Sequence, residues 1–156
     1  MTIAPGAPID AADILAAIAR TGCKLRNPSQ AIANITQTDI SWTIEDEDTN
    51  AFHVGGTASA VVVPTGFAGL YSITFGALFN ALSAGARTFA SINIISAVTG
   101  GHLDQYRDRT DSSEDRAQVG ITVPLLDGDS FTCNVFHTQG ASLNITAHLS
   151  FYRVGL

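Results

Sequence analysis

The feature of this sequence that most restricts its fold is an alternation of apolar and polar residues with a period of two, which begins near residue 30 and continues to the end. The longest run covers residues 143–152, where Leu, Ile, Ala, Leu and Phe occupy every second position. Residues 71–79 show the same pattern with Tyr, Ile, Phe, Ala and Phe. Alternate residues of a strand point to opposite faces of a sheet, so these runs predict strands with one face on a core and one polar face.

Further runs of this kind follow one another at short spacing, separated by turn signals. The runs cover residues 40–44 and 119–123 and, more weakly, 30–36, 58–63, 86–98 and 129–138. The turn signals are Pro64-Thr65-Gly66, Ala68-Gly69, Ala84-Gly85, Asp127-Gly128 and Gln139-Gly140. About eight short strands with such turns predict an all-β, antiparallel jelly-roll sandwich.

A short helix is predicted only before these strands, within residues 8–22. Asp10 can cap its start, Gly22 can close its end, and an apolar stripe lies between them. A helix this short is marginal alone in water, so it needs a surface on its own domain, on symmetry mates or on a larger assembly. We therefore divide the chain into an N-terminal arm, residues 1–27, for attachment or docking, and a head domain, residues 28–156.

Charge and composition exclude several classes of partner. Charged residues make up 14% of the chain, the net charge is −6, and Lys24 is the one lysine, so the chain lacks the basic surface with which proteins bind nucleic acid. No apolar run approaches the roughly 18 to 20 residues that cross a bilayer. The opening MTIAPGAPID lacks the basic start and apolar run of a signal peptide. We expect synthesis in a cytoplasm without membrane insertion.

Asp127 and Asp129 are the pair that most suggests catalysis, because hydrolases use paired carboxylates. Such pairs need a concave pocket in which one carboxyl has a raised pKa. Asp127-Gly128 instead lies between two apolar runs, a pattern typical of a hairpin turn, with Asp129 starting the next strand. We therefore favour a structural role for both aspartates, in the turn and at the start of the next strand, over a catalytic one.

Asp46, Asp48 and Asn50 have the spacing that opens a calcium-binding loop. Ala51 stands where that loop needs a glycine, and Thr57 stands where it needs a bidentate glutamate. The EF-hand interpretation therefore fails. A solvated loop is favoured, and a looser surface calcium site, including one shared between subunits, stays open as the alternative.

No other arrangement of residues indicates catalysis or cofactor binding. The four histidines lack the spacing of metal ligands, and Cys23 and Cys133 lack that of a zinc site, so we expect buried thiols. Neither a nucleophile elbow nor a phosphate-binding loop is present. The sequence predicts a protein that is not an enzyme.

Residues 99–116 form a polar stretch of mixed charge, predicted as a long loop with Tyr106, Arg107 and Arg109 near its centre. Long loops on all-β scaffolds often carry binding residues, and Tyr and Arg are typical contact residues. These three residues are the candidates for partner binding. A merely solvated loop is the other interpretation.

Four passages together resemble a known family. They are QAIANITQTDISW followed by EDEDTNAF, then GFAGLYSITFGALF, then ITVPLLDGDSF, and finally SLNITAHLSFYRVG. By their order and spacing, residues 30–156 resemble the jelly-roll head shared by the complement first-component subunit q (C1q) and tumour necrosis factor (TNF) families, in the form found in bacteriophage structural proteins.

The resemblance implies a homotrimer around a threefold axis that recognises partners through exposed loops and grooves, without catalysis. It also implies roles in the fold for Gly69, Tyr71, Gly128 and Asp129, and packing at or near the axis for Phe151 and Tyr152.

The leading hypothesis is a phage virion structural protein, assembled in the host cytoplasm. The N-terminal helix would tether the trimer to other proteins of the tail, fibre or capsid. The exposed loops would bind a host-surface protein or glycan, or decorate the particle. The alternative is a monomeric carbohydrate-binding module of a bacterial system.

Overall fold

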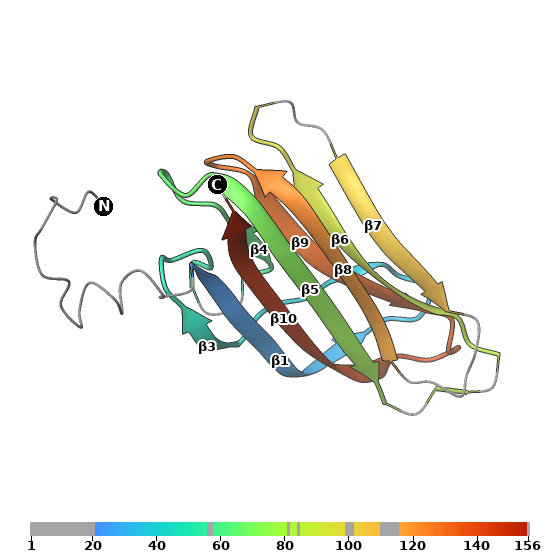
Figure 1. Ribbon diagram of the computed structural model, residues 1–156. Coiled ribbons are helices and arrows are strands. Elements are labelled where there is room, and N and C mark those ends of the chain that lie inside the picture. The colour runs from blue at the N-terminus through green and yellow to red at the C-terminus, as the bar shows by residue number, and fades with distance from the viewer. Residues whose placement is uncertain are drawn as a thin grey trace, which may run out of the picture.

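The computed structural model describes residues 21–55, 58–80, 82–83, 85–98, 102–109 and 116–155, with the backbone path alone for 102–109. These residues form two antiparallel sheets packed face to face (Figure 1). The strands are β1 (Gly22–Ile32), β2 (Thr38–Asp39), β3 (Ile44–Asp48), β4 (Ala60–Val62), β5 (Gly69–Phe79), β6 (Thr88–Ile95), β7 (His102–Arg109), β8 (Arg116–Leu125), β9 (Ser130–His137) and β10 (Leu143–Gly155).

One sheet, called sheet A, has the strand order β3-β1-β10-β5-β8. The other, sheet B, has the order β2-β9-β6-β7, and β4 also pairs with β9. Along the described strands, the chain passes from one sheet to the other at every connection except the one between β6 and β7. This crossing pattern confirms the predicted jelly roll. Among the described residues no helix is long and apolar enough to span a bilayer.

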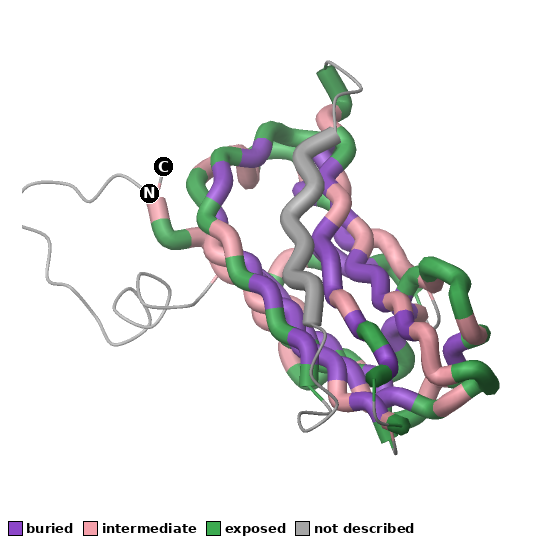
Figure 2. The backbone as a smooth tube through the Cα atoms, turned by 90° about the vertical axis from the view of Figure 1, so that its right-hand side faces the viewer, coloured by how far each residue is buried: buried purple, intermediate pink, exposed green. Residues whose placement is uncertain are grey.

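The core lies between the two sheets and consists of the apolar residues of the alternating runs. Along the strands buried positions alternate with partly or fully exposed ones (Figure 2). Tyr71 and Phe151, from neighbouring strands of sheet A, stack with ring centroids 4.5 Å apart, and Phe52 packs edge-on against both. Buried aromatic side chains are a main source of stability in such cores. The predicted inward faces of residues 71–79, 131–135 and 145–151 are confirmed.

The first strand was not predicted over its full length. β1 pairs with β10 from Gly22 onward, so Gly22–Asn27 belong to the head and not to the arm, which was predicted to reach residue 27. Asn27-Pro28 was a poor strand signal, because proline cannot donate to a ladder. The sheet accommodates it in a bulge between Asn27 and Gln30, where the Asn27 side chain accepts a hydrogen bond from the Ser29 N–H.

Two further predictions were a strand over residues 40–44 and a helix within residues 8–22. Ile40 and Trp42 are buried as their alternation predicted, but they lie in a connection between β2 and β3 and not in a strand. The predicted helix within residues 8–22 lies outside the described residues, apart from Gly22, which opens β1.

Candidate functional site

The segment 126–129 is a tight turn between the two sheets. The Asp129 N–H donates to the Leu126 carbonyl at 3.0 Å, and Gly128 has a φ of 84°, a conformation that favours glycine. The turn prediction is confirmed, but the hairpin prediction is wrong. β8 belongs to sheet A and β9 to sheet B, so the strands that flank the turn do not pair.

Asp127 holds a loop that is distant in sequence. Its carboxylate accepts hydrogen bonds from the N–H groups of Gly66 at 2.8 Å, Phe67 at 3.1 Å and Ala68 at 2.8 Å. These backbone donors, first of all Gly66, and the positive charge of Arg153 lower the pKa of Asp127. The carboxylate is therefore an anionic acceptor that fixes the loop before β5.

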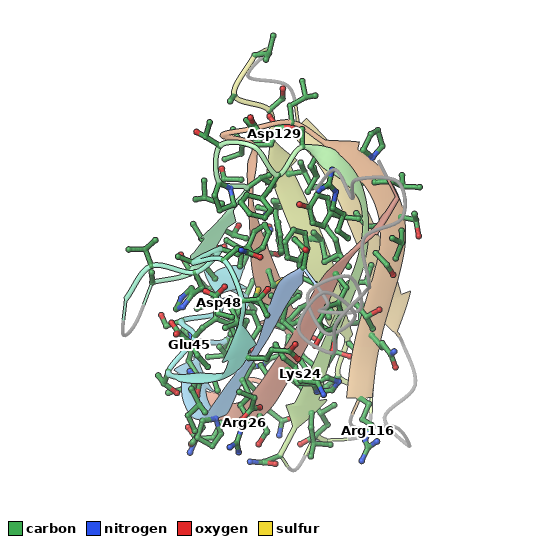
Figure 3. All side chains as sticks on the ribbon, turned by 60° about the vertical axis from the view of Figure 1, so that its left-hand side comes forward. Lys24, Arg26, Glu45, Asp48, Arg116 and Asp129 are labelled. Atoms are coloured by element: carbon green, nitrogen blue, oxygen red, sulfur yellow. The ribbon has the colours of Figure 1, made fainter. Side chains whose placement is uncertain are left out.

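Asp129 does the same for a second loop. It is 4% exposed, and its carboxylate accepts from the N–H groups of Leu126 and Ala97, both at 2.8 Å. Figure 3 shows it at one end of the sandwich. Both acids that could suggest catalysis are thus occupied by backbone N–H groups. The turn interpretation of this pair is confirmed.

The acidic residues of β3 and the loop after it have separate partners. Asp46 forms an ion pair with Arg26 at 2.9 Å, whereas Asp48 accepts from the N–H groups of Phe52 and His53 at 3.0 and 2.9 Å. Within the described part of the chain, no three His, Cys, Asp or Glu side chains are grouped so that they could hold a metal ion. A calcium site that uses Asp46, Asp48 and Asn50 across subunits stays a prediction.

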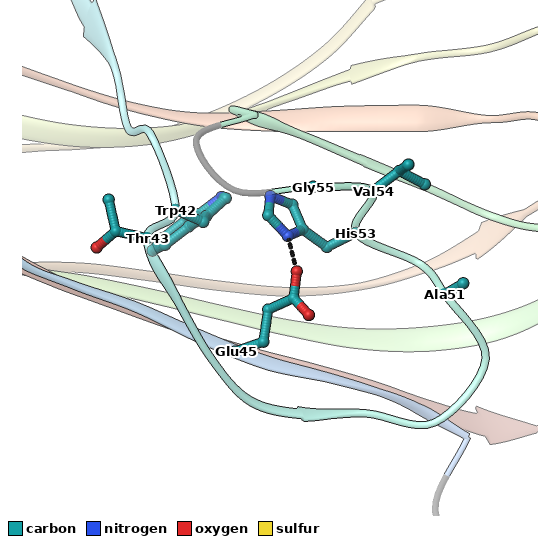
Figure 4. Close-up of a pocket in the computed structure, with 7 residues that line it drawn as sticks. All are labelled: Trp42, Thr43, Glu45, Ala51, His53, Val54 and Gly55. Carbon is teal, nitrogen blue, oxygen red and sulfur yellow. Dashed lines mark hydrogen bonds and ion pairs between the residues drawn. The ribbon is translucent and has the colours of Figure 1, made fainter.

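A hollow of about 500 Å³ lies beside this acidic segment (Figure 4). His53 is buried at its wall, with Nδ1 2.6 Å from Oε1 of Glu45 and Nε2 3.0 Å from the Ala58 carbonyl oxygen. Each ring nitrogen of His53 thus lies within hydrogen-bonding distance of an oxygen acceptor. The Trp42 indole nitrogen, also buried here, has no hydrogen-bond partner among the described residues. Glu45 and His53 therefore close the loop that follows β3.

A second hollow, of about 210 Å³, lies on the outer face of sheet A. Its lining comprises Gly76, Ala77, Leu78, Arg116, Ala117, Gln118, Thr146 and His148. Partial burial and the neighbouring Arg116 lower the pKa of His148. Among the described residues, its polar side chains are those of Arg116, His148, Gln118 and Thr146, whose hydroxyl donates to the Pro28 carbonyl.

The partner-binding candidates Tyr106, Arg107 and Arg109 lie on β7 and not in a loop. β7 is the edge strand of sheet B, and these residues pair in register with Ser91, Ala90 and Thr88 of β6. The loop prediction is wrong because mixed charge is typical of edge strands as well as of loops. Partner binding by these residues stays a prediction.

The two candidates for packing at a threefold axis are placed differently from each other. Phe151 is fully buried in the core of its own chain, which excludes it from an interface, since its position on β10 alternates inward. Tyr152 is on the outer face of sheet A, and its hydroxyl donates to Glu47 at 2.8 Å. Tyr152 alone stays a candidate for packing between copies.

Sequence reasoning missed both hollows. Glu45 and His53 are eight residues apart, and no motif connects them. One signal could have pointed to the second hollow, because Gly76 interrupts a strongly alternating strand. A glycine inside a strand often marks a place where another group approaches closely.

Comparison with known proteins identifies the fold. No protein-family model and no curated protein sequence matches the chain. Among solved structures, the globular domain of zebrafish complement 1qA covers 86% of this chain and 97% of its own, at 15% identity and a TM-score of 0.65. The PRD1 vertex protein P5 covers 86% and 96%, at 16% identity and a TM-score of 0.60. Eiger TNF from S. frugiperda covers 87% and 93%, at 11% identity and a TM-score of 0.57. The resemblance to C1q/TNF-like jelly-roll heads is thereby confirmed at the level of fold.

Proposed function

We propose that this chain is a non-enzymatic structural head of a bacteriophage particle. It acts as a homotrimer, is attached to the tail, fibre or capsid through the residues before β1, and presents loops for host-surface binding or decoration. One observation carries this proposal: the chain shares its fold, over 86% of its length, with the PRD1 vertex protein P5.

The use of the acidic side chains supports a role without catalysis. Asp127 and Asp129 both accept hydrogen bonds from backbone N–H groups of neighbouring loops. A general acid or base must be free to exchange a proton with a substrate, and these carboxylates are committed to holding the fold.

The outer face of sheet A supports packing between copies. Leu70 pairs with Pro124 on one side and Gly155 on the other, next to Val154. Leu70 is 37% exposed, Val154 is 58% exposed, and Pro124 is exposed as well. This apolar end of sheet A, together with Tyr152, is a surface that a symmetric oligomer would cover.

Light scattering coupled to size-exclusion chromatography tests the trimer. The full chain should elute with the mass of three copies, and Leu70→Glu should shift it toward one copy. Val98→Glu is the matched control, since Val98 is 72% exposed and lies outside this surface. A monomeric native chain would refute the trimer.

Mass spectrometry and antibody labelling of purified phage particles test the structural role. The chain should be present in the particles, and its variant without residues 1–20 should fold but be absent from them. Absence of the native chain from the particles would refute the structural role.

A monomeric carbohydrate-binding module is the second candidate. Phe89 and Phe136 stack on the outer face of sheet B at 5.0 Å, and both are partly exposed, as aromatic residues in sugar-binding surfaces are. Glycan-array binding by a monomer, lost in Phe136→Ala, would favour this function over the first.

A further inference from the structure

The outer face of sheet A has a gap in its layer of side chains at Gly76. Gly76 of β5 pairs with His148 of β10 on one side and with Gln118 of β8 on the other. Two residues along, Leu78 pairs with Thr146 and Arg116 on the same strands. Adjacent strands lie roughly 4.8 Å apart, so the long side chains of β8 and β10 can reach over the gap from both sides.

The His148 imidazole occupies part of this gap. A Cβ atom at position 76 would lie 2.5 Å from Cε1 and 2.6 Å from Nε2 of His148, which is closer than any real contact. The ring therefore leans over Gly76 because a glycine is there. The rest of the gap is the hollow of about 210 Å³, with backbone at its floor and Arg116 and Gln118 at its far side.

The hollow collects hydrogen-bond donors and positive charge. Arg116 and Gln118 are exposed, and the lining also offers the Thr146 hydroxyl and the His148 ring. Among the described residues that line the hollow, none is acidic. On the other side of His148, the neighbouring strand β1 places Arg26 in register with it. The charge of Arg26 is neutralised by its ion pair with Asp46. Among the described residues that line the hollow, none offers Arg116 such a carboxylate.

The charge of Arg116 affects the His148 ring. Partial burial and the neighbouring Arg116 guanidinium lower the pKa of His148, because both disfavour the protonated ring. An anion bound between the two side chains would oppose the effect of Arg116 and favour the protonated ring.

We propose that this hollow binds a small oxyanion, that is, a carboxylate, sulfate or phosphate group. The Arg116 guanidinium is the principal donor, because its planar fork matches two oxygens of such a group. His148 and Gln118 supply further donors. The Thr146 hydroxyl lines the hollow but already donates to the Pro28 carbonyl at 3.1 Å. The hollow is smaller than the roughly 300 to 1,000 Å³ of sites for drug-sized ligands, so it suits an inorganic anion or one acidic group of a larger molecule such as an acidic sugar. All residues of this site belong to one chain, although they lie on the same outer face of sheet A as the apolar end that is proposed to pack between copies.

NMR titration of the His148 ring in the full chain tests the proposal. Sulfate, phosphate or glucuronate should raise the pKa of His148, because a bound anion stabilises the protonated ring. Chloride at matched ionic strength is the control for general screening, and glucose is the control for sugar binding without charge. Arg116→Gln should weaken binding by about tenfold or more, which corresponds to roughly 1.4 kcal/mol. The matched control is Arg87→Gln, which removes an exposed arginine that lies outside the hollow.

A second variant keeps the test decisive if Arg116→Gln also alters the fold. Gly76→Ala should weaken binding while Arg116 is retained, because the added methyl group displaces the His148 ring. Binding of glucuronate in preference to sulfate and phosphate would identify an acidic sugar as the ligand, and the reverse order an inorganic anion. A His148 titration that none of the three anions changes beyond chloride, or that changes equally in Arg116→Gln, would overturn the proposal.

Discussion

Two acid-rich segments, the turn 126–129 and residues 45–48 of β3, look alike in sequence but are used differently. In the turn, both carboxylates accept from backbone N–H groups of another loop, and Asp129 also accepts from Leu126 of its own turn. In β3, Glu45 and Asp46 pair with the side chains of His53 and Arg26, and Asp48 accepts from the backbone N–H groups of Phe52 and His53. Backbone donors are fixed in place by the fold, whereas an exposed ion pair loses side-chain entropy when it forms. We therefore expect the carboxylates of the turn to contribute more to stability than Glu45 and Asp46 of β3, with the buried partner of Glu45, His53, as the exception.

The largest effect should come from Asp129→Ala. This change leaves the N–H groups of Leu126 and Ala97 without their acceptor at a site where Asp129 is 4% exposed. We expect a loss of about 2 to 3 kcal/mol in the free energy of unfolding, measured by urea denaturation. Asp129→Asn, which keeps one acceptor oxygen, should lose less. A loss below about 0.5 kcal/mol for Asp129→Ala would show that water replaces the carboxylate.

His53→Ala should come next, since it is the buried member of the β3 segment. Its side chain is 1% exposed, and its removal leaves Glu45 and the Ala58 carbonyl without their donor. We expect a loss of about 1 to 3 kcal/mol, again from urea denaturation. Glu45→Gln retains a hydrogen-bond acceptor for His53 and should lose less. Equal losses in the two variants would mean that the charge of Glu45, and not the buried ring, closes the loop.

Asp127→Asn should have a smaller effect that depends on pH, because this carboxylate is exposed. The folded-state pKa of Asp127 is lowered below its ordinary 3.8, first of all by the Gly66 N–H. Its contribution is therefore fully present above the unfolded-state pKa and is lost as the pH falls through the lower folded-state pKa. The native chain should be more stable than Asp127→Asn at pH 7, and the difference should shrink below about pH 4. A difference that stays constant from pH 7 to about pH 2 would contradict this mechanism.

Arg26→Ala should have the smallest effect and sharpens the contrast between the two segments. The side chains of Arg26 and Asp46 are 50% and 38% exposed, so their ion pair is screened by water and salt. We expect a loss of about 0.5 kcal/mol or less, decreasing further in high salt. A loss above about 1 kcal/mol would place this ion pair among the structural contacts.

Much of the fold could be predicted from the alternation of apolar and polar residues, and the strand that was missed, β7, has an unusual local sequence. The inward faces of β5, β9 and β10 follow directly from their alternation, because burial needs apolar residues at every second position. β7 was missed because HLDQYRDR is charged, as edge strands often are. Neither hollow could be predicted, since each joins residues of strands or loops that are apart in sequence.

The sequence by itself determined the all-β class, the inward residues of most strands and the turn at Asp127-Gly128. These depend on residue spacing and on glycine's conformational freedom, which are properties of a short segment. Tertiary structure alone decided that β8 and β9 lie in different sheets, that Asp127 holds a loop 61 residues away, and that Gly76 lies beneath His148. The physical reason is that strand pairing and carboxylate partners depend on the path of the whole chain, which no local pattern records.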